Sequence, residues 1–371
     1  MTPAQLVLDR AGLDRLIGAL AARGYRVLGP TIRDDAIVYG DLASTSDLPV
    51  GWTDRQEAAK YRLARRDDDA LFGYVVGPQS PKTYLHPAEV VVWAGGQTAT
   101  GFAMTPPADS PRYAFLGVRP CELAAIAVQD RVFLGGERDA VYGSRRREVF
   151  LVAVNCTEPG GTCFCASMGT GPGAETGFDI VLTEVLDKKE HYFTAAAGSE
   201  RGAEVLAEVG AVEAKKAQVK AGADLVEAAA GHMGRTMETA GLADLLRQSL
   251  EHPHWQEVAK RCLTCANCTL VCPTCFCANV EDTTDLTGRH AERTRRWDSC
   301  FNLEFSLIHG GAHRASTAAR YRQWMTHKLA WWFDQFGTSG CVGCGRCITW
   351  CPVGIDITAE AAAIRGKQEV V

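Results

Sequence analysis

The chain has 371 residues, of which 46% are hydrophobic and 22% charged, and its formal net charge is −5. This length and composition are typical of a folded globular protein with two or three domains, which excludes an intrinsically disordered chain. The negative net charge argues against nucleic acid as the main partner.

The N-terminal part predicts helices alternating with strands. Hydrophobic side chains repeat at helical spacing from Leu13 to Leu20, and Gly24 ends this predicted helix. Short β-branched or aromatic runs bounded by Gly, Pro or Asp predict strands at 25–28, 36–39, 90–93, 113–118, 150–154 and 179–185. A further helix is predicted over 122–128. These elements together predict a buried mixed sheet with helices.

The remainder of the chain has a more helical pattern. Residues 201–247 are rich in Ala, Glu, Leu and Lys, and Pro253 interrupts the pattern. A long helix is predicted over 316–336, whose tryptophans we interpret as core packing. We therefore predict an α/β domain with a mixed sheet and helices over residues 1–252. A mostly α-helical ferredoxin-type domain is predicted over residues 253–371.

No stretch of the sequence predicts a membrane span or a secretory signal. The longest apolar runs, such as 149–154, have the length of a strand, far below the roughly 20 residues that a spanning helix needs. Asp9 and Asp14 interrupt the N-terminal segment, unlike the apolar core of a signal peptide. We therefore expect the protein to act without inserting into a membrane.

One cysteine spacing occurs twice and carries the strongest chemical signal. The copies are Cys262-x-x-Cys265-x-x-Cys268-x-x-x-Cys272-Pro273 and Cys341-x-x-Cys344-x-x-Cys347-x-x-x-Cys351-Pro352. Four cysteines in this order followed by proline are the bacterial-type signature for [4Fe–4S] clusters, whose soft thiolate ligands suit iron–sulfur chemistry. The alternative is structural zinc, which usually takes two well separated Cys-x-x-Cys pairs.

In two-cluster proteins with this spacing, the fourth cysteine of each run ligates the other cluster. We therefore predict two cross-ligated clusters. The first ferredoxin set is Cys262, Cys265, Cys268 and Cys351, and the second ferredoxin set is Cys341, Cys344, Cys347 and Cys272.

Seven of the fifteen cysteines remain after these eight are subtracted. Four of them, Cys121, Cys156, Cys163 and Cys165, follow predicted strands, where α/β sheets place their sites, and we name them the strand-end set. This set is a candidate for a third [4Fe–4S] cluster. An alternative uses Cys275, Cys277 or Cys300, with one Cys-Phe-Cys from each domain and the cluster between them. A further alternative is that all seven are buried, unreactive thiols.

An odd number of cysteines, eight of them in metal-binding spacing, is a poor framework for disulfides, so we expect a reducing compartment, the cytoplasm.

The glycine-rich run 169–173 is not expected to bind a dinucleotide. It contains proline and does not lead from a predicted strand into a predicted helix, as a dinucleotide-binding loop does. Because the sequence predicts iron–sulfur clusters but no substrate-binding motif, we predict a non-catalytic electron-transfer subunit. The alternative is a stand-alone reductase with its substrate at Cys121 or Cys156.

Several segments resemble the beta subunit of soluble [NiFe] sulfhydrogenases and the related electron-transfer subunit of anaerobic sulfite reductases. The resemblance covers roughly residues 110 to 360 and rests on residues 117–125, 155–165, 272–277, 297–300, 327–329 and 340–347. It implies a cytoplasmic complex in which a flavin subunit with a [2Fe–2S] cluster takes electrons from NAD(P)H. This chain would relay them to hydrogenase small and large subunits, or to a sirohaem subunit in the sulfite reductases.

Overall fold

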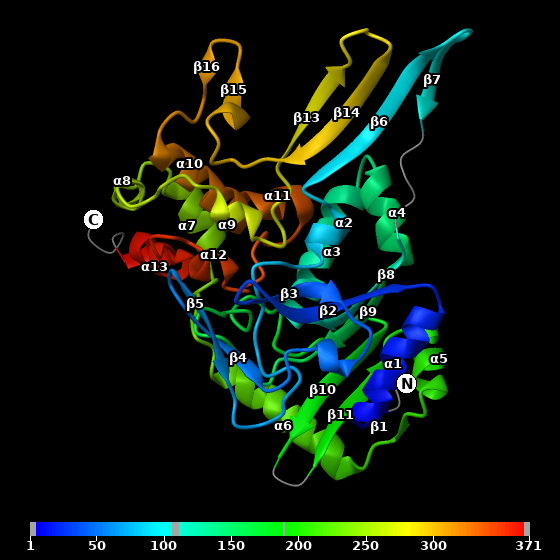
Figure 1. The fold of residues 1–371 in the computed structure, drawn as a ribbon. Helices are drawn as coiled ribbons and strands as arrows, with labels where there is room; N and C mark the ends of the chain where they lie inside the picture. Colours follow the sequence, from blue (N-terminus) through cyan, green and yellow to red (C-terminus); the bar gives the residue numbers. More distant parts are fainter. Residues whose placement is uncertain (1–4, 106–110, 188–189, 367–371) are drawn as a thin grey trace.

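The computed structural model describes residues 5–105, 111–187 and 190–366. It contains one large sheet, a smaller sheet that projects from the body, and a group of short helices towards the C-terminus (Figure 1). The mixed α/β architecture predicted from the sequence is confirmed. Within the described residues, no helix is both long and apolar enough to cross a membrane.

The large sheet has eight strands in the order β12-β1-β11-β10-β9-β8-β2-β3. Its centre is parallel, because β2, β8, β9 and β10 pair in parallel, whereas its outer pairs are antiparallel. The strands are β1 (Leu6–Leu8), β2 (Arg26–Arg33), β3 (Ala36–Asp41), β8 (Tyr113–Val118), β9 (Phe150–Val154), β10 (Ile180–Leu186), β11 (His191–Ala197) and β12 (Val212–Glu213). The apolar strands β8 and β9 are buried throughout, as expected for a parallel sheet covered on both faces.

Helices cover both faces of this sheet. On one face α1 (Arg10–Ala22) and α5 (Glu200–Glu208) pack their leucines and valines into a core with Phe150 and Phe193. On the other face α3 (Pro120–Leu134) and α4 (Ala140–Glu148) pack on Phe115 and Leu151. Helix α6 (Lys216–Gly231) contacts β10 and β11. The parallel strands therefore end at one edge with α3 beginning directly after β8.

The helices of the C-terminal part are short. They are α7 (Leu242–Gln248), α8 (His254–Ala259), α9 (Asn267–Leu270), α10 (Thr317–Thr326), η3 (His327–Trp331), α11 (Trp332–Phe336), α12 (Arg346–Thr349) and α13 (Ile357–Gly366). The helix predicted over 316–336 is present, but a π-helical turn, η3, divides it into two α-helices. Tyr321, Trp324 and Trp332 are buried, as core packing predicts, whereas Trp331 is 37% exposed.

The strand predicted over 90–93 is present within β6 (Glu89–Thr98), but it belongs to a projecting sheet that the sequence did not predict, and not to the buried mixed sheet. The projecting sheet has the order β13-β14-β6-β7, from β6, β7 (Gly101–Thr105), β13 (Ala278–Thr284) and β14 (His290–Trp297). Strand β14 pairs with β6, so the sheet crosses the predicted boundary between residues 252 and 253. The C-terminal part therefore contains strands as well as helices, and the position of the domain boundary stays a prediction.

Three smaller elements complete the described fold. A hairpin of β4 (Trp52–Glu57) and β5 (Lys60–Arg65) packs against α12, where Tyr61 stacks on Trp350 at 5.1 Å between ring centroids. Helix α2 (Lys82–Leu85) precedes β6, and a second short hairpin, β15 (Leu307–Ile308) with β16 (Gly311–Ala312), projects beside the small sheet (Figure 1). The 3₁₀ turns are η1 (Thr45–Asp47) and η2 (Glu304–Ser306).

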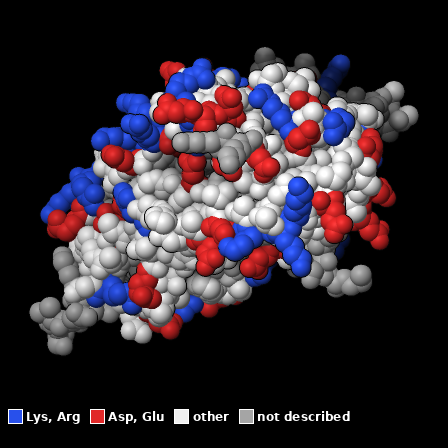
Figure 2. All heavy atoms as spheres, turned by 90° about the horizontal axis from the view of Figure 1, so that it is seen from below, with Lys and Arg blue, Asp and Glu red and all other residues white. Residues whose placement is uncertain are grey.

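The face of the molecule seen in Figure 2 carries lysines and arginines beside aspartates and glutamates, with uncharged areas between them. Many of the charged side chains in the described chain are paired across short distances, as in Arg26–Asp41 at 2.5 Å. Interspersed signs give this face little net attraction for a partner of one charge.

A buried ion pair joins the C-terminal part to the large sheet. Arg346 Nη2 lies 2.6 Å from Glu122 Oε1, and the two side chains are 1% and 2% exposed. Arg346 also donates to the carbonyls of Gly77 and Gln79, each at 2.8 Å. Glu122 accepts a hydrogen bond from the Tyr39 hydroxyl at 2.9 Å. Such satisfied partners are what a buried pair needs to offset the cost of removing two charges from water.

We predict that Glu122→Gln lowers the free energy of unfolding by roughly 3–5 kcal/mol, because Arg346 then stays charged and buried without its partner. The measurement is anaerobic urea denaturation followed by tryptophan fluorescence. The control, Asp282→Asn, removes an exposed pair with Arg293 whose side chains are 64% and 52% exposed. Because water and salt screen this exposed pair, its loss should leave the free energy of unfolding almost unchanged. A Glu122→Gln effect as small as the control's would contradict the prediction.

Candidate iron–sulfur centres

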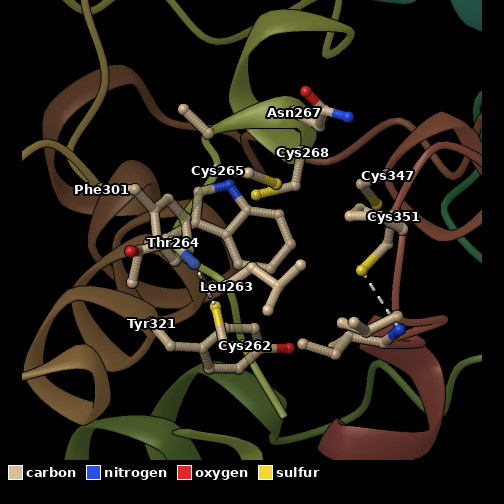
Figure 3. A pocket seen from close by; sticks show the side chains of 15 residues that line it. Cys262, Leu263, Thr264, Cys265, Asn267, Cys268, Phe301, Tyr321, Cys347 and Cys351 are labelled. Atoms are coloured by element: carbon tan, nitrogen blue, oxygen red, sulfur yellow. Dashed lines mark hydrogen bonds between the residues drawn. The ribbon is translucent and has the colours of Figure 1, made fainter.

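Cysteines from both motifs line one pocket. Cys262, Cys265 and Cys268 face Cys351 across a hollow, with Cys347 nearby (Figure 3). Among the described residues, no three or more of His, Cys, Asp and Glu are arranged to hold a single metal ion. The structure therefore brings together the four cysteines of the first ferredoxin set.

Backbone amides in the motif loops point at sulfur atoms. Thr264 N donates to Cys262 Sγ at 3.4 Å, and Ile355 N donates to Cys351 Sγ at 3.3 Å. In the second motif the equivalent donor is Gly343 N, 3.5 Å from Cys341 Sγ. These amides would stabilise negatively charged sulfur, which is one of the ways in which proteins tune iron–sulfur centres.

The two loops reach this geometry with different residues. Thr264 and Ala266 have φ values of +51° and +67°, whereas the equivalent positions of the second motif are Gly343 and Gly345 at +64° and +75°. A non-glycine residue in this left-handed region costs roughly 1–2 kcal/mol. The first loop therefore carries backbone strain that the second loop avoids.

The second ferredoxin set also comes together. Burial raises the pKa of the Cys347 thiol, and the neighbouring charges of the other three cysteines of the set raise it further. Burial likewise raises the pKa of Cys344, with Cys272 adding to the effect. A bound metal reverses this tendency, because a coordinating thiol is deprotonated. Cys272 therefore lies with the cysteines of the other motif, as cross-ligation predicts.

A buried lysine lies against this second set. Lys328, on the π-helical turn η3, is 3% exposed and its Nζ lies 3.3 Å from Cys272 Sγ. It also donates to Thr274 Oγ1 at 3.0 Å and to the Gly340 carbonyl at 3.1 Å. Burial disfavours the ammonium, but negative charge on the neighbouring cysteines outweighs it and raises the pKa of Lys328 well above its usual value.

The strand-end set forms a separate group of thiols at the carboxyl edge of the large sheet. Cys121 follows β8 and Cys156 follows β9, and all four thiols are buried, with exposed fractions of 5% to 8%. Burial raises the pKa of the Cys121 thiol, and the charges of Cys165, Cys344 and Cys156 add to it. Burial raises the pKa of Cys165 to about 12, with Cys156 among the contributors.

The strand-end set lies against the second motif. Cys163 Sγ is 3.9 Å from the Cys344 carbonyl, and Phe164 N donates to the Gly343 carbonyl at 2.8 Å. The glycine-rich run 169–173 packs on the same loop, because a Cβ at Gly171 would lie 3.1 Å from Cys165 Sγ. Arg119 lies beside Cys156 and lowers the pKa of that thiol against the larger opposing effect of burial. This group could hold a third cluster next to the second one.

The remaining cysteines belong to a different group. Cys275, Cys277 and Cys300 lie in the C-terminal core, and the Cys275 thiol is within hydrogen-bonding reach of Cys272. The cysteines of 163–165 therefore lie near other thiols than those of 275–277. A single cluster held by both Cys-Phe-Cys sequences remains an untested alternative. Sequence reasoning gave no role to Lys82, Arg119, Glu122 or Arg346. Arg119 and Glu122 flank Cys121, and Arg346 lies inside the second motif, so their positions could have suggested a role, whereas that of Lys82 could not.

Comparison with known proteins identifies a 4Fe-4S domain in the part of the chain that holds both motifs. Residues 261–355 match the family model of the 4Fe-4S dicluster domain, a range that includes both motifs. The sequence is 34% identical to sulfhydrogenase 2 subunit beta of Pyrococcus furiosus over 248 residues, which cover 66% of this chain and 72% of the relative. No solved structure matches the chain.

We predict that Cys351→Ser removes the first cluster although Cys351 lies in the second motif, because its sulfur faces the first pocket. The reciprocal control is Cys272→Ser, which should remove the second cluster from within the first motif. Iron, acid-labile sulfide and electron paramagnetic resonance would be measured on anaerobically purified protein. If Cys351→Ser damaged only the second cluster, each motif would hold its own cluster and cross-ligation would be wrong.

We also predict that Lys328→Met lowers the reduction potential of the second cluster by on the order of 100 mV, the effect of a unit charge about 7 Å away at an effective dielectric constant of about 20. Loss of a buried cation makes it harder to add an electron. A redox titration followed by electron paramagnetic resonance measures the shift. Lys260→Met, which removes a 68% exposed ammonium, is the control and should leave the potential unchanged. Equal potentials in both variants would contradict the prediction.

Proposed function

This chain belongs to the sulfhydrogenase beta-subunit family, and we propose that it is the iron–sulfur electron-transfer subunit of a cytoplasmic, NAD(P)-linked [NiFe] hydrogenase complex. One observation carries the proposal. The first ferredoxin set lies next to the second, and the second lies next to the strand-end set, within a chain that contains a dicluster domain. This arrangement suits a relay of single electrons.

We assign one [4Fe–4S] cluster to each ferredoxin set and a third to the strand-end set. Cys347 belongs to the second set and also lines the first pocket. Cys344 belongs to the second set and lies beside Cys121 and Cys163. The second cluster is therefore the middle of the proposed relay, with the first cluster on one side and the third on the other.

The bound clusters supply the change of one electron at a time. The chain's own residues supply the surroundings. Burial of the strand-end thiols and of Cys272 and Cys344 excludes water from these sulfurs. The amides of Thr264, Gly343 and Ile355 donate hydrogen bonds to sulfur. The cations of Lys328 and Arg119 balance negative charge at Cys272 and Cys156. Hydrogen bonding, burial and charge are the factors that set cluster potentials.

The buried strand-end thiols favour a relay over a stand-alone reductase. Cys121 is 6% and Cys156 is 8% exposed, which leaves little access for a substrate at either sulfur. The fifteen cysteines form no disulfide, in keeping with a reducing compartment such as the cytoplasm. We propose that the electron donor from NAD(P)H is a flavin and [2Fe–2S] subunit, and that the acceptors are the hydrogenase small and large subunits.

The test uses the assembled complex carrying Cys163→Ser in this chain. We expect it to lose about four irons per chain, the content of one cubane cluster, and most NAD(P)H-driven hydrogen evolution. Hydrogen oxidation with a dye that takes electrons directly from the hydrogenase subunits should continue, because their catalytic centre is untouched. Full iron content would remove the third cluster from the proposal. Unchanged NAD(P)H-driven evolution after Cys265→Ser, in a first-set ligand, would contradict the relay itself.

A further inference from the structure

Three cysteines outside the proposed relay are brought together by a hairpin of the projecting sheet. Cys275 and Cys277 precede β13, and Cys300 follows β14. These strands pair antiparallel with Ala278 opposite Trp297, and Asp298 N donates to the Cys277 carbonyl at 2.9 Å. The base of the hairpin thus places the Cys277 thiol within hydrogen-bonding reach of Cys300. We name Cys275, Cys277 and Cys300 the hairpin set.

Cys272 connects this set to the second ferredoxin set. The Cys275 thiol is within hydrogen-bonding reach of Cys272. Cys272 also lies near Cys344 and Cys347 of the second motif. The three hairpin cysteines therefore lie next to Cys272, and they belong to the same core as most of the ferredoxin cysteines.

Two buried ammonium groups face this group of sulfurs. Lys328 contacts Cys272, as described above, and Lys82 on α2 is 5% exposed. Lys82 Nζ donates to the Cys275 carbonyl at 3.2 Å and lies 3.8 Å from the centre of the Trp297 ring. The hydrogen-bond partners of the two ammonium groups are carbonyls, a hydroxyl, and the sulfur of Cys272, and the described residues place no carboxylate in an ion pair with either one.

Buried charges require compensation, because transfer of an unpaired ammonium from water into a protein core is very costly. Lys328 lies against Cys272, a ligand of the proposed second cluster, whereas Lys82 lies against the Cys275 carbonyl beside the hairpin set. Negative charge on the hairpin set would compensate Lys82, because metal-bound cysteines are thiolates.

We propose that Cys275, Cys277 and Cys300 hold a further iron–sulfur cluster, a three-cysteine site whose negative charge Lys82 and Lys328 balance. Thiolates are the ligands that iron–sulfur clusters prefer. Cys272 serves the second cluster, so the fourth iron of this site takes a ligand other than cysteine. The site goes beyond the relay proposed above, and it makes the hairpin set a separate centre rather than a substitute for the strand-end set.

The experiment measures iron and acid-labile sulfide per full-length chain, purified without oxygen in its complex. Cys277→Ser and Cys300→Ser should each lose about four irons and four sulfides, and the double variant should lose no more than either single one. Cys300→Ser combined with Cys163→Ser should lose about eight, because the two sets are separate. One electron paramagnetic resonance signal should disappear from Cys300→Ser while the signals of the ferredoxin clusters remain.

Ser299→Ala is the matched control, since Ser299 is 1% exposed, adjoins Cys300 and donates to no sulfur. It should keep its full iron, and loss of the same iron from it would overturn Cys300 as a ligand. Unchanged iron in both cysteine variants, zinc in place of iron, or a disulfide between Cys277 and Cys300 found by mass spectrometry would also overturn the proposal. If Cys277→Ser or Cys300→Ser lost NAD(P)H-driven electron transfer but kept these four irons, the hairpin set would not be a cluster site. The proposed electron-transfer function of the chain would still stand.

Lys82 gives a second test that does not remove a ligand. Lys82→Met should lower the iron content assigned to the hairpin set several-fold, because the thiolates lose a compensating charge, whereas Lys82→Arg should retain it. Equal iron content and an identical resonance signal in both variants would overturn the charge balance on which the proposal stands.

Discussion

The buried ion pair between Arg346 and Glu122 joins the second cysteine motif to the large sheet. Arg346 lies between two cysteines of the second motif, and Glu122 directly follows Cys121. The pair therefore joins the second ferredoxin set to the strand-end set through two adjacent residues. Its hydrogen bonds to Tyr39, Gly77 and Gln79 extend this connection to β3 and to the segment before α2. A less satisfied pair would not repay the desolvation of two buried charges.

Compensation of charge is the second principle of the structure. Buried thiols resist ionisation, yet cluster ligands must be thiolates. The chain places a buried cation beside each inner group: Arg119 at the strand-end set, Arg346 and Lys328 at the second set, and Lys82 at the hairpin set. The first pocket lies nearer the surface, with Cys265 exposed. Two of its sulfurs accept hydrogen bonds from backbone amides, and Arg320 lies near Cys262. Amide dipoles therefore act on both ferredoxin sets, and the deeper groups have buried cations as well.

Much of this arrangement could be predicted from local sequence, because cysteine spacing and strand ends are local features. The motif spacing predicted that Cys351 would join Cys262, and the apolar runs 113–118 and 150–154 predicted strands that end beside Cys121 and Cys156. The projecting sheet was missed. Strands β13 and β14 are mostly polar and lie on an exposed surface, so neither has the apolar alternation of a half-buried strand. Their pairing with β6 depends on a contact between distant parts of the chain. Lys82 was missed for a related reason, since an isolated lysine gives no signal of burial.

The shared first pocket has a consequence for how the protein is made. Cys262, Cys265 and Cys268 leave the ribosome well before Cys351, which completes their pocket. At roughly 5–20 residues per second, the three early sulfurs wait several seconds for the fourth. During that time they form an incomplete, solvent-exposed site that is open to oxidation. Under the proposed cross-ligation, a nascent chain that stalls before residue 341 would lack ligands for both ferredoxin clusters, and one that stalls between residues 347 and 351 would lack a ligand for the first cluster alone.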